Sequence, residues 1–182
     1  TDPAGYKTQK QFNSQDKVLR LSQQMHLASD AGQNAALTWQ HSDFTYDPLG
    51  RLTAITDAQN NFKQQKFNGL GHKIWQSDLD QGITHYEYDS TGKLNLKTDQ
   101  LGRKLHYRYD GAGRLSQILN NTLTLLYQYH YDAPQYGGSA QKDGGYKGKL
   151  SWVEEFNPGS NGGQTNSEHY HYDLRGNVIH KQ

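Results

Sequence analysis

His169, His171 and Asp173 have the residue types and the spacing of a metal site. If this stretch is a β-strand, side chains two residues apart point to the same face, so the three would share one face. Imidazole and carboxylate groups are zinc ligands. No further metal ligand can be identified elsewhere in the sequence, and the exposed polar face of a strand explains the same pattern. We therefore expect no metal and no cofactor.

Two pairs of carboxylates could perform acid-base chemistry or hydrolyse glycosides, namely Asp78 with Asp80 and Glu154 with Glu155. Turn and surface positions account for both pairs better. The chain has no cysteine, which excludes a thiol nucleophile and a disulfide framework. We expect that the chain is not an enzyme and that it has no catalytic residues.

Aromatic side chains could stack on sugar rings, and Trp39, Trp75 and Trp152 are the candidates for this among the tryptophans. Burial in the fold is the competing interpretation of the same residues. A carbohydrate or cell-surface binding module that uses aromatic faces is therefore an alternative function.

These residues lie in a sequence that repeats, and self-similarity at a fixed period indicates a repeat architecture. "FTYDPLGRL", "QKFNGLGHKI", "HYEYDSTGKL" and "HYRYDGAGRL" share an aromatic residue, then Asp or Asn, two further residues and a glycine. The aromatic positions, 21 residues apart, are Tyr46, Phe67, Tyr88 and Tyr109, and the glycines are Gly50, Gly71, Gly92 and Gly113.

A second turn signal falls halfway through each copy, where Asp57, Asp78 and Asp99 lie 11 residues after the aromatic position. The unit is therefore two strands joined by two turns. Looser copies at Phe12, Tyr131 and Tyr172 bring the total to about seven repeats. We expect residues 1–182 to be a single repeat segment of a larger chain, with insertions near 19–42, 133–147 and 156–168.

Alternation within "HYRYD" puts Tyr107 and Tyr109 on one face of a strand and the residues between them on the other. The Asp110 carboxylate can accept the backbone N–H two residues on, as in an Asx-turn, and Gly113 can take the positive φ that closes a short hairpin. Basic residues such as Arg114 follow the turn glycines. They could pair with the turn acids or keep the strand edges soluble, and we favour pairing.

Composition agrees with a repeat strip rather than a compact globule. Only 32% of the 182 residues are apolar, and mean hydropathy is −1.03. A curved or spiral sheet that shares aromatic rows between neighbouring repeats needs a smaller core than a globule does. The net charge of +1 indicates no nucleic-acid partner, and no apolar run is long enough for membrane insertion by this segment.

The recurring pattern Y-D-x-x-G-R-L resembles the YD repeat of Rhs proteins, which is also found in the B and C components of insecticidal Tc toxin complexes and in teneurins. Phe67-Asn68 and Phe12-Asn13 depart from it, and Asp16 stands where the pattern has glycine. The resemblance implies an all-β fold of antiparallel two-strand hairpins forming a curved or spiral sheet, a section of a hollow shell.

The resemblance also implies a structural role in a large secreted or cell-surface bacterial protein, such as a toxin whose shell encloses a C-terminal effector. The implied partners are neighbouring repeats of the same polypeptide, an encapsulated effector domain or toxin-complex subunit, and, in the alternative, a glycan. The residues expected to define the repeat are Tyr46, Asp47, Gly50, Arg51, Gly71, Tyr88, Asp89, Gly92, Tyr109, Asp110, Gly113, Arg114, Tyr172, Asp173 and Gly176.

Overall fold

A computed structural model of the chain describes residues 3, 5–26, 37–132, 147–157, 164–173, 175 and 177–181. Gly176 lies outside these residues, as do 27–36, 133–146 and 158–163, which make up parts of the three expected insertions. Among the described residues there is no helix, and so none long and apolar enough to cross a membrane.

Fourteen β-strands account for the regular structure of the described residues. They are β1 (Thr8–Phe12), β2 (Val18–His26), β3 (Leu37–Tyr46), β4 (Leu52–Thr56), β5 (Phe62–Phe67), β6 (Lys73–Asp78), β7 (Gly82–Tyr88), β8 (Leu94–Asp99), β9 (Lys104–Tyr109), β10 (Leu115–Leu119), β11 (Leu125–Tyr131), β12 (Leu150–Phe156), β13 (Gln164–Tyr172) and β14 (Val178–Lys181).

The chain divides into two compact units, Thr1–His85 and Tyr86–Gln182. In the first unit each strand from β1 to β7 pairs antiparallel with the next in sequence. In the second unit the strands from β8 to β14 do the same. The all-β class and the antiparallel hairpins expected from the sequence are confirmed.

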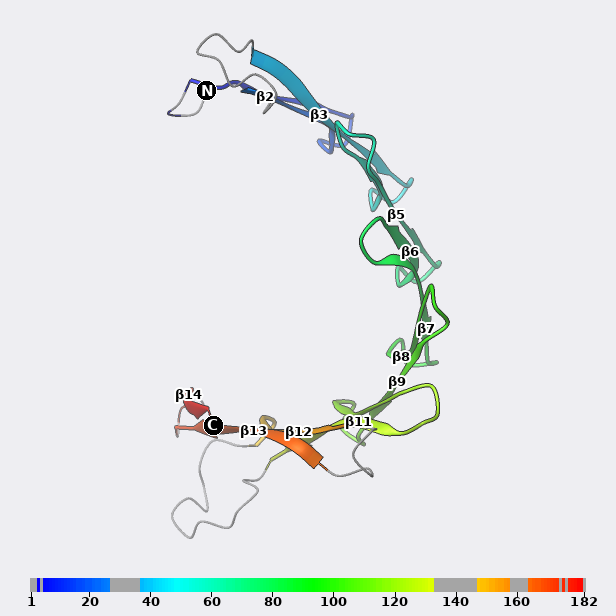
Figure 1. The fold of residues 1–182 in the computed structure, drawn as a ribbon, viewed down its shortest axis with the longest axis vertical. Helices are drawn as coiled ribbons and strands as arrows, with labels where there is room; N and C mark the ends of the chain where they lie inside the picture. The colour runs from blue at the N-terminus through cyan, green and yellow to red at the C-terminus, as the bar shows by residue number, and fades with distance from the viewer. Residues whose placement is uncertain are drawn as a thin grey trace. The chain divides into compact units, whose positions relative to one another are not determined.

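Within each unit the strands form one layer, with no second layer over the described part of either face (Figure 1). A single layer cannot enclose much side-chain surface, so few described residues are buried. The buried apolar side chains are Leu119 and Tyr172, and the buried polar ones include Thr84 and Ser151. A sheet one layer thick needs few apolar side chains, which agrees with the low apolar content of the sequence.

The expected insertion at 19–42 falls largely in paired strands. β2 and β3 extend the ordinary hairpin, with Arg20 opposite Asp43 at one end of the register and His26 opposite Leu37 at the other. The Arg20 guanidinium donates to both carboxylate oxygens of Asp43, at 2.6 and 2.8 Å. The described extra residues therefore lengthen both strands along their own direction and do not interrupt the sheet.

The fourth residue of most of the described tight turns adopts a left-handed backbone conformation. Gly50 and Gly113 have φ of 73° and 80° at this position, which glycine adopts without steric cost. Asp16, Asn60 and Leu123 occupy the same position in other turns, with φ of 56°, 62° and 59°. Asp16 was a departure from the sequence pattern, but it takes the conformation of the glycine that it replaces.

Leu123→Gly should raise the free energy of unfolding by about 0.5–1 kcal/mol, because relief of the left-handed strain outweighs the added entropy of the unfolded chain. Leu123 is 54% exposed, so little packing is lost. Leu101 is a matched control, since it is 70% exposed in a similar turn and has no positive φ. Leu101→Gly should be destabilising, and a urea midpoint that moves the same way in both variants would contradict the strain argument.

Candidate functional site

The repeat turn is built around one aspartate side chain. In the turn of residues 110–114, Asp110 Oδ1 accepts the backbone N–H groups of Ala112 at 3.0 Å and Arg114 at 2.8 Å. The backbone closes the same loop, because Asp110 N–H donates to the Arg114 carbonyl and Gly113 N–H donates to the Asp110 carbonyl. The Asx-turn expected at Asp110 is present, and it extends over two donors instead of one.

The same geometry recurs in other turns, both at the motif and midway through the repeat. At Asp57, midway through a unit, Oδ1 accepts the N–H groups of Gln59 and Asn61 at 2.9 and 2.8 Å. The other turns in which one side-chain oxygen accepts from the second and fourth following residues begin at Asn13, Asp47, Asn68, Asp89, Asp99, Asn120 and Asp173. Most mid-unit turns are therefore equivalent in structure to the motif turns, although only the latter carry the conspicuous sequence pattern. The turn that begins at Asp78 differs, because its Oδ1 accepts from Asp80 and Gln81 and its positive φ falls on Gly82.

The basic residue that ends the turn pairs with the aspartate that begins it. Arg51 Nε lies 2.6 Å from Asp47 Oδ2, and Arg114 Nε lies 2.8 Å from Asp110 Oδ2. This is the pairing that the sequence favoured. In the turn beginning at Asp57, Asn61 Nδ2 makes the equivalent bond at 2.8 Å. An amide can therefore replace the guanidinium where the pattern lacks arginine.

The motif tyrosine connects one repeat to the preceding one. Tyr109 Oη donates to the carbonyl of Leu94 at 2.8 Å, and Leu94 is the apolar residue that ends the preceding motif. The same bond joins Tyr46 to Val18, Tyr131 to Leu115 and Tyr172 to Leu150, at 2.7–3.0 Å. Each of these carbonyls belongs to the first residue of its strand, where the chain leaves the turn.

Phe67 stands in the tyrosine position but has no hydroxyl. The carbonyl that it would have bonded, that of Leu52, instead accepts from Gln65 Nε2 at 2.7 Å. Gln65 lies two residues before Phe67 on β5, so the two side chains share a face. The Gln65 amide thus takes the place of the missing tyrosine hydroxyl, so the Leu52 carbonyl keeps a hydrogen-bond partner.

In several motifs a cation lies over the aromatic ring of the next motif. The Arg51 guanidinium is 4.7 Å from the centroid of the Phe67 ring, and Arg114 is 4.2 Å from that of Tyr131. Lys93 over Tyr109 and Lys149 over Tyr172 repeat the contact. A cation held over an aromatic ring is attracted by the electron density of its face. We call this series of turns, cations, rings and carbonyls the turn ladder.

Residues 88–122 match the family model described as RHS Repeat. These residues therefore carry an Rhs repeat. The matched residues contain the motif Tyr88-Asp89 with Gly92 and the motif Tyr109-Asp110 with Gly113 and Arg114. None of the curated proteins compared matches the chain.

The solved structures similar to this chain include those of TcdB2-TccC3 and TcdB2-TccC3-Cdc42, each with a TM-score of 0.60 and 17% identity. The similarity covers 93% of this chain and 9% of those chains. A third similar structure is TcdB2-TccC3-TEV, with a TM-score of 0.50 and 18% identity, covering 96% of this chain and 11% of that one. At this level of identity the likeness shows a shared fold, and the chain spans about a tenth of the length of those it matches.

Hydrogen bonds in the Rhs-repeat turns stabilise the charged form of their carboxylates. The backbone N–H of Arg114, followed by its guanidinium, lowers the pKa of Asp110 despite some desolvation. Arg114 also reaches the next turn, where it binds both oxygens of Asp132 at 3.0 and 2.8 Å. That guanidinium, with the Gly148 backbone N–H, lowers the pKa of Asp132 from 3.8 to about 2. Arg114 therefore links two successive turns electrostatically.

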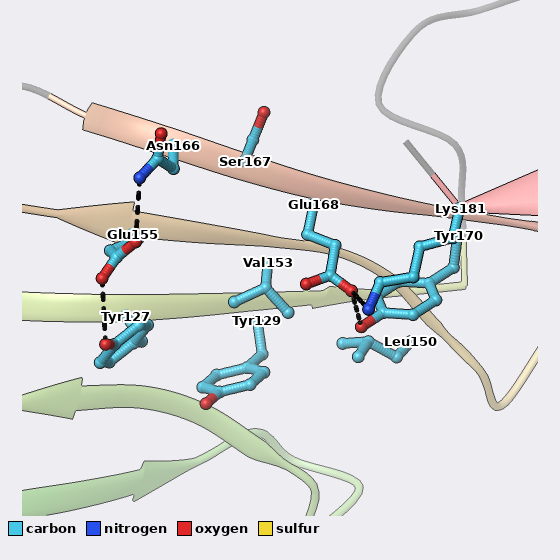
Figure 2. Close-up of a pocket in the computed structure, with 10 residues that line it drawn as sticks. All are labelled: Tyr127, Tyr129, Leu150, Val153, Glu155, Asn166, Ser167, Glu168, Tyr170 and Lys181. Carbon is cyan, nitrogen blue, oxygen red and sulfur yellow. Dashed lines mark hydrogen bonds and ion pairs between the residues drawn. The ribbon is translucent and has the colours of Figure 1, made fainter.

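The tyrosine face, which carries the motif aromatics, has a groove over β11–β14 in the second unit (Figure 2). Its aromatic lining is Tyr127, Tyr129 and Tyr170, and its acidic lining is Glu155 and Glu168. Tyr127 Oη donates to Glu155 at 3.1 Å, and Tyr170 Oη donates to Glu168 at 2.6 Å. Burial raises the pKa of Tyr129. The groove thus combines ring surfaces with fixed hydrogen-bond acceptors.

The three tryptophans lie on the face opposite the motif aromatics, according to the strand register. All three are half-buried. Trp75 lies under the Lys66 ammonium at 4.8 Å, and Trp152 stacks on His130 with ring centroids 4.1 Å apart. Side chains of this same face thus lie over the rings of Trp75 and Trp152.

The carboxylate pairs do not form a shared acid-base site. Glu154 and Glu155 point to opposite faces of β12, where Glu154 meets His130 Nε2 at 2.8 Å. Asp78 begins a turn, with Oδ1 accepting the Asp80 N–H at 2.9 Å and Oδ2 lying 2.6 Å from Lys63 Nζ. These contacts give each pair a role in the sheet and its turns.

Arg114→Met should raise the pKa of Asp132 from about 2 toward its ordinary value of 3.8, because the guanidinium is the main cause of the shift. The folded-state pKa lies below the unfolded one, so the stabilisation from this contact is complete above pH 3.8 and is lost as the pH falls toward 2. An NMR titration of the Asp132 carboxyl carbon measures the shift. Arg108→Met, which removes a guanidinium from the opposite face, should leave that pKa unchanged; an equal change in both variants would contradict the assignment.

Proposed function

We propose that this chain is a structural section of an Rhs/YD-repeat shell in a large secreted or cell-surface bacterial protein, and that the shell encloses a C-terminal effector. The observation that carries the proposal is the turn ladder. Its contacts run from each repeat to the next, as in Arg114 to Asp132 and Tyr131. Such contacts hold neighbouring hairpins together without a central core.

The thickness of the sheet and the side chains on its two faces are compatible with the wall of a hollow shell. Each unit is one strand layer thick, and its two faces carry half-buried aromatic and polar side chains rather than a continuous apolar surface. A sheet with water on both sides buries little apolar surface, so contacts that hold successive hairpins rigidly together matter more for its stability. The charge-assisted and cation-ring contacts of the turn ladder supply that stiffness at the sheet edges.

The similar structures support the part of the proposal that concerns a C-terminal domain. One of them is TcdB2-TccC3 without its hypervariable C-terminal region, so that protein carries a C-terminal region beyond the part shared with this chain. By analogy we infer that a C-terminal domain follows these repeats in the parent polypeptide. We propose that the repeats themselves are not catalytic, and that they contact neighbouring repeats and the enclosed domain or a toxin-complex subunit.

A second candidate function is carbohydrate binding, and the groove of Figure 2 is the observation that favours it. The Tyr127 and Tyr170 rings could each face a sugar ring, and Asn166 and Glu168 could bond its hydroxyl groups. The Glu168 carboxylate is held by both Tyr170 and Lys181, which fixes the position of its acceptors. This arrangement differs from the sequence-based candidates, since no tryptophan lines the groove.

Limited proteolysis of the parent polypeptide tests enclosure. The C-terminal domain should survive protease that degrades the same domain expressed alone. Asp110→Ala should remove this protection, because it takes the acceptor from two backbone N–H groups and the partner from Arg114. Glu87→Ala removes one carboxylate from an exposed position and should preserve protection. A C-terminal domain cleaved equally fast in every form would refute enclosure.

A glycan array probed with residues 1–182 tests the second function. If the groove binds sugars, Tyr170→Ala should abolish the signal because a stacking surface is lost. Glu154→Gln, on the opposite face of the same sheet, should leave the signal intact. Absence of any bound glycan, or equal loss in both variants, would remove this function and leave the structural one unaffected.

A further inference from the structure

The strand register of the second unit brings together two histidines that the sequence left apart. β13 and β14 pair antiparallel, with His171 directly opposite His180. The two ring centroids are 5.6 Å apart, and the rings are tilted by 43°. From these contacts we propose that His171 and His180 form a two-histidine site for a transition-metal ion, preferentially Cu²⁺.

The ring separation is close to that required for coordination. A metal ion bound at about 2.0–2.1 Å to one nitrogen of each ring, with a nitrogen–metal–nitrogen angle of about 90–110°, would hold the two ring centroids roughly 4.5–5.3 Å apart. The observed 5.6 Å is only slightly larger. A small rotation of either side chain closes the difference, since His180 is exposed and His171 is only half-buried. The backbone pairing therefore places the ligands in advance.

The ligand set differs from the one that the sequence suggested. Asp173 uses Oδ1 to accept the N–H groups of Arg175 and Asn177, each at 2.9 Å, and Oδ2 to accept Asn177 Nδ2 at 3.0 Å. Its carboxylate thus belongs to the turn. His169 shares the face of His171, but its Nε2 meets Ser167 Oγ at 2.9 Å and its ring lies along Trp152. The opposing residue on β14 is the better partner.

The number of protein ligands determines which ions fit. Among the described residues no third His, Cys, Asp or Glu joins a group that could hold a metal, so water must complete the coordination. Structural zinc sites almost always take four protein ligands, which disfavours that assignment. Imidazole suits copper, nickel and zinc, and Cu²⁺ binds a given nitrogen site most tightly of the three.

Metal binding here would fasten β14 to β13. β14 is the last strand of the unit, and its register with β13 comprises three residue pairs. An ion that binds only the paired strands favours their association by mass action. The site would therefore stabilise the pairing of β13 with β14, independently of whether the chain encloses an effector.

Titration of residues 1–182 with CuCl₂, followed by electron paramagnetic resonance and calorimetry, tests the site. We expect one tight Cu²⁺ per chain with nitrogen coupling in its spectrum. His180→Gln should weaken binding by at least about tenfold, since even outer-sphere partners of metal ligands contribute that much. The fold should survive this change, because His180 is exposed.

His169→Gln and His106→Gln are the matched controls, since each removes an imidazole from the same face and leaves the cross-strand pair intact. Both should retain the tight site. Copper bound as tightly by His180→Gln as by the unmodified chain would overturn the proposal. Loss of binding in His169→Gln equal to that in His180→Gln would also overturn it, as would several equivalent ions without a single tight one.

Discussion

The rest of the structure depends on a carboxylate, or in some copies a carboxamide, that closes a five-residue turn. A strip of short strands must reverse direction about every ten residues, and each reversal leaves backbone N–H groups without partners in the sheet. Asp110 satisfies two of them with one oxygen and leaves the other for Arg114. Because the acceptor comes from the turn itself, each hairpin can close without help from a distant core.

The same turn makes neighbouring hairpins interdependent. Arg114 is held at its base by Asp110, and this fixes its guanidinium where Asp132 and the Tyr131 ring can meet it. The Tyr131 hydroxyl then returns to the carbonyl of Leu115, the residue that follows Arg114. Contacts between successive repeats thus begin and end on one short motif. Because these contacts need no large apolar core, a chain with 32% apolar residues can form an extended sheet.

The sequence predicted those parts of the fold that depend on local chemistry. Alternating tyrosines and turn residues at fixed offsets specify strands and hairpins, and Asp110 and Gly113 carry enough information to predict the turn. The contacts between repeats were not predictable in the same way. That Gln65 would replace a missing hydroxyl at the Leu52 carbonyl depends on which strand ends lie side by side. Likewise, the left-handed Leu123 shows that the surrounding turn can override a residue's own preference.

Strand alternation predicts the face on which a side chain lies, but it does not predict which side chain of the neighbouring strand lies opposite it. Period two put His171 on the face opposite the motif tyrosines, which the structure agrees with, yet it could not identify the residue across from it. That residue is set by the length of the turn between β13 and β14, because adding one residue to a strand would move every later side chain to the other face. His180 reaches His171 only because the turn that begins at Asp173 reproduces the repeat geometry, with Asn177 bonded in place of a basic residue. The turn therefore determines which side chains lie opposite each other on a face of the sheet, as well as the path of the chain.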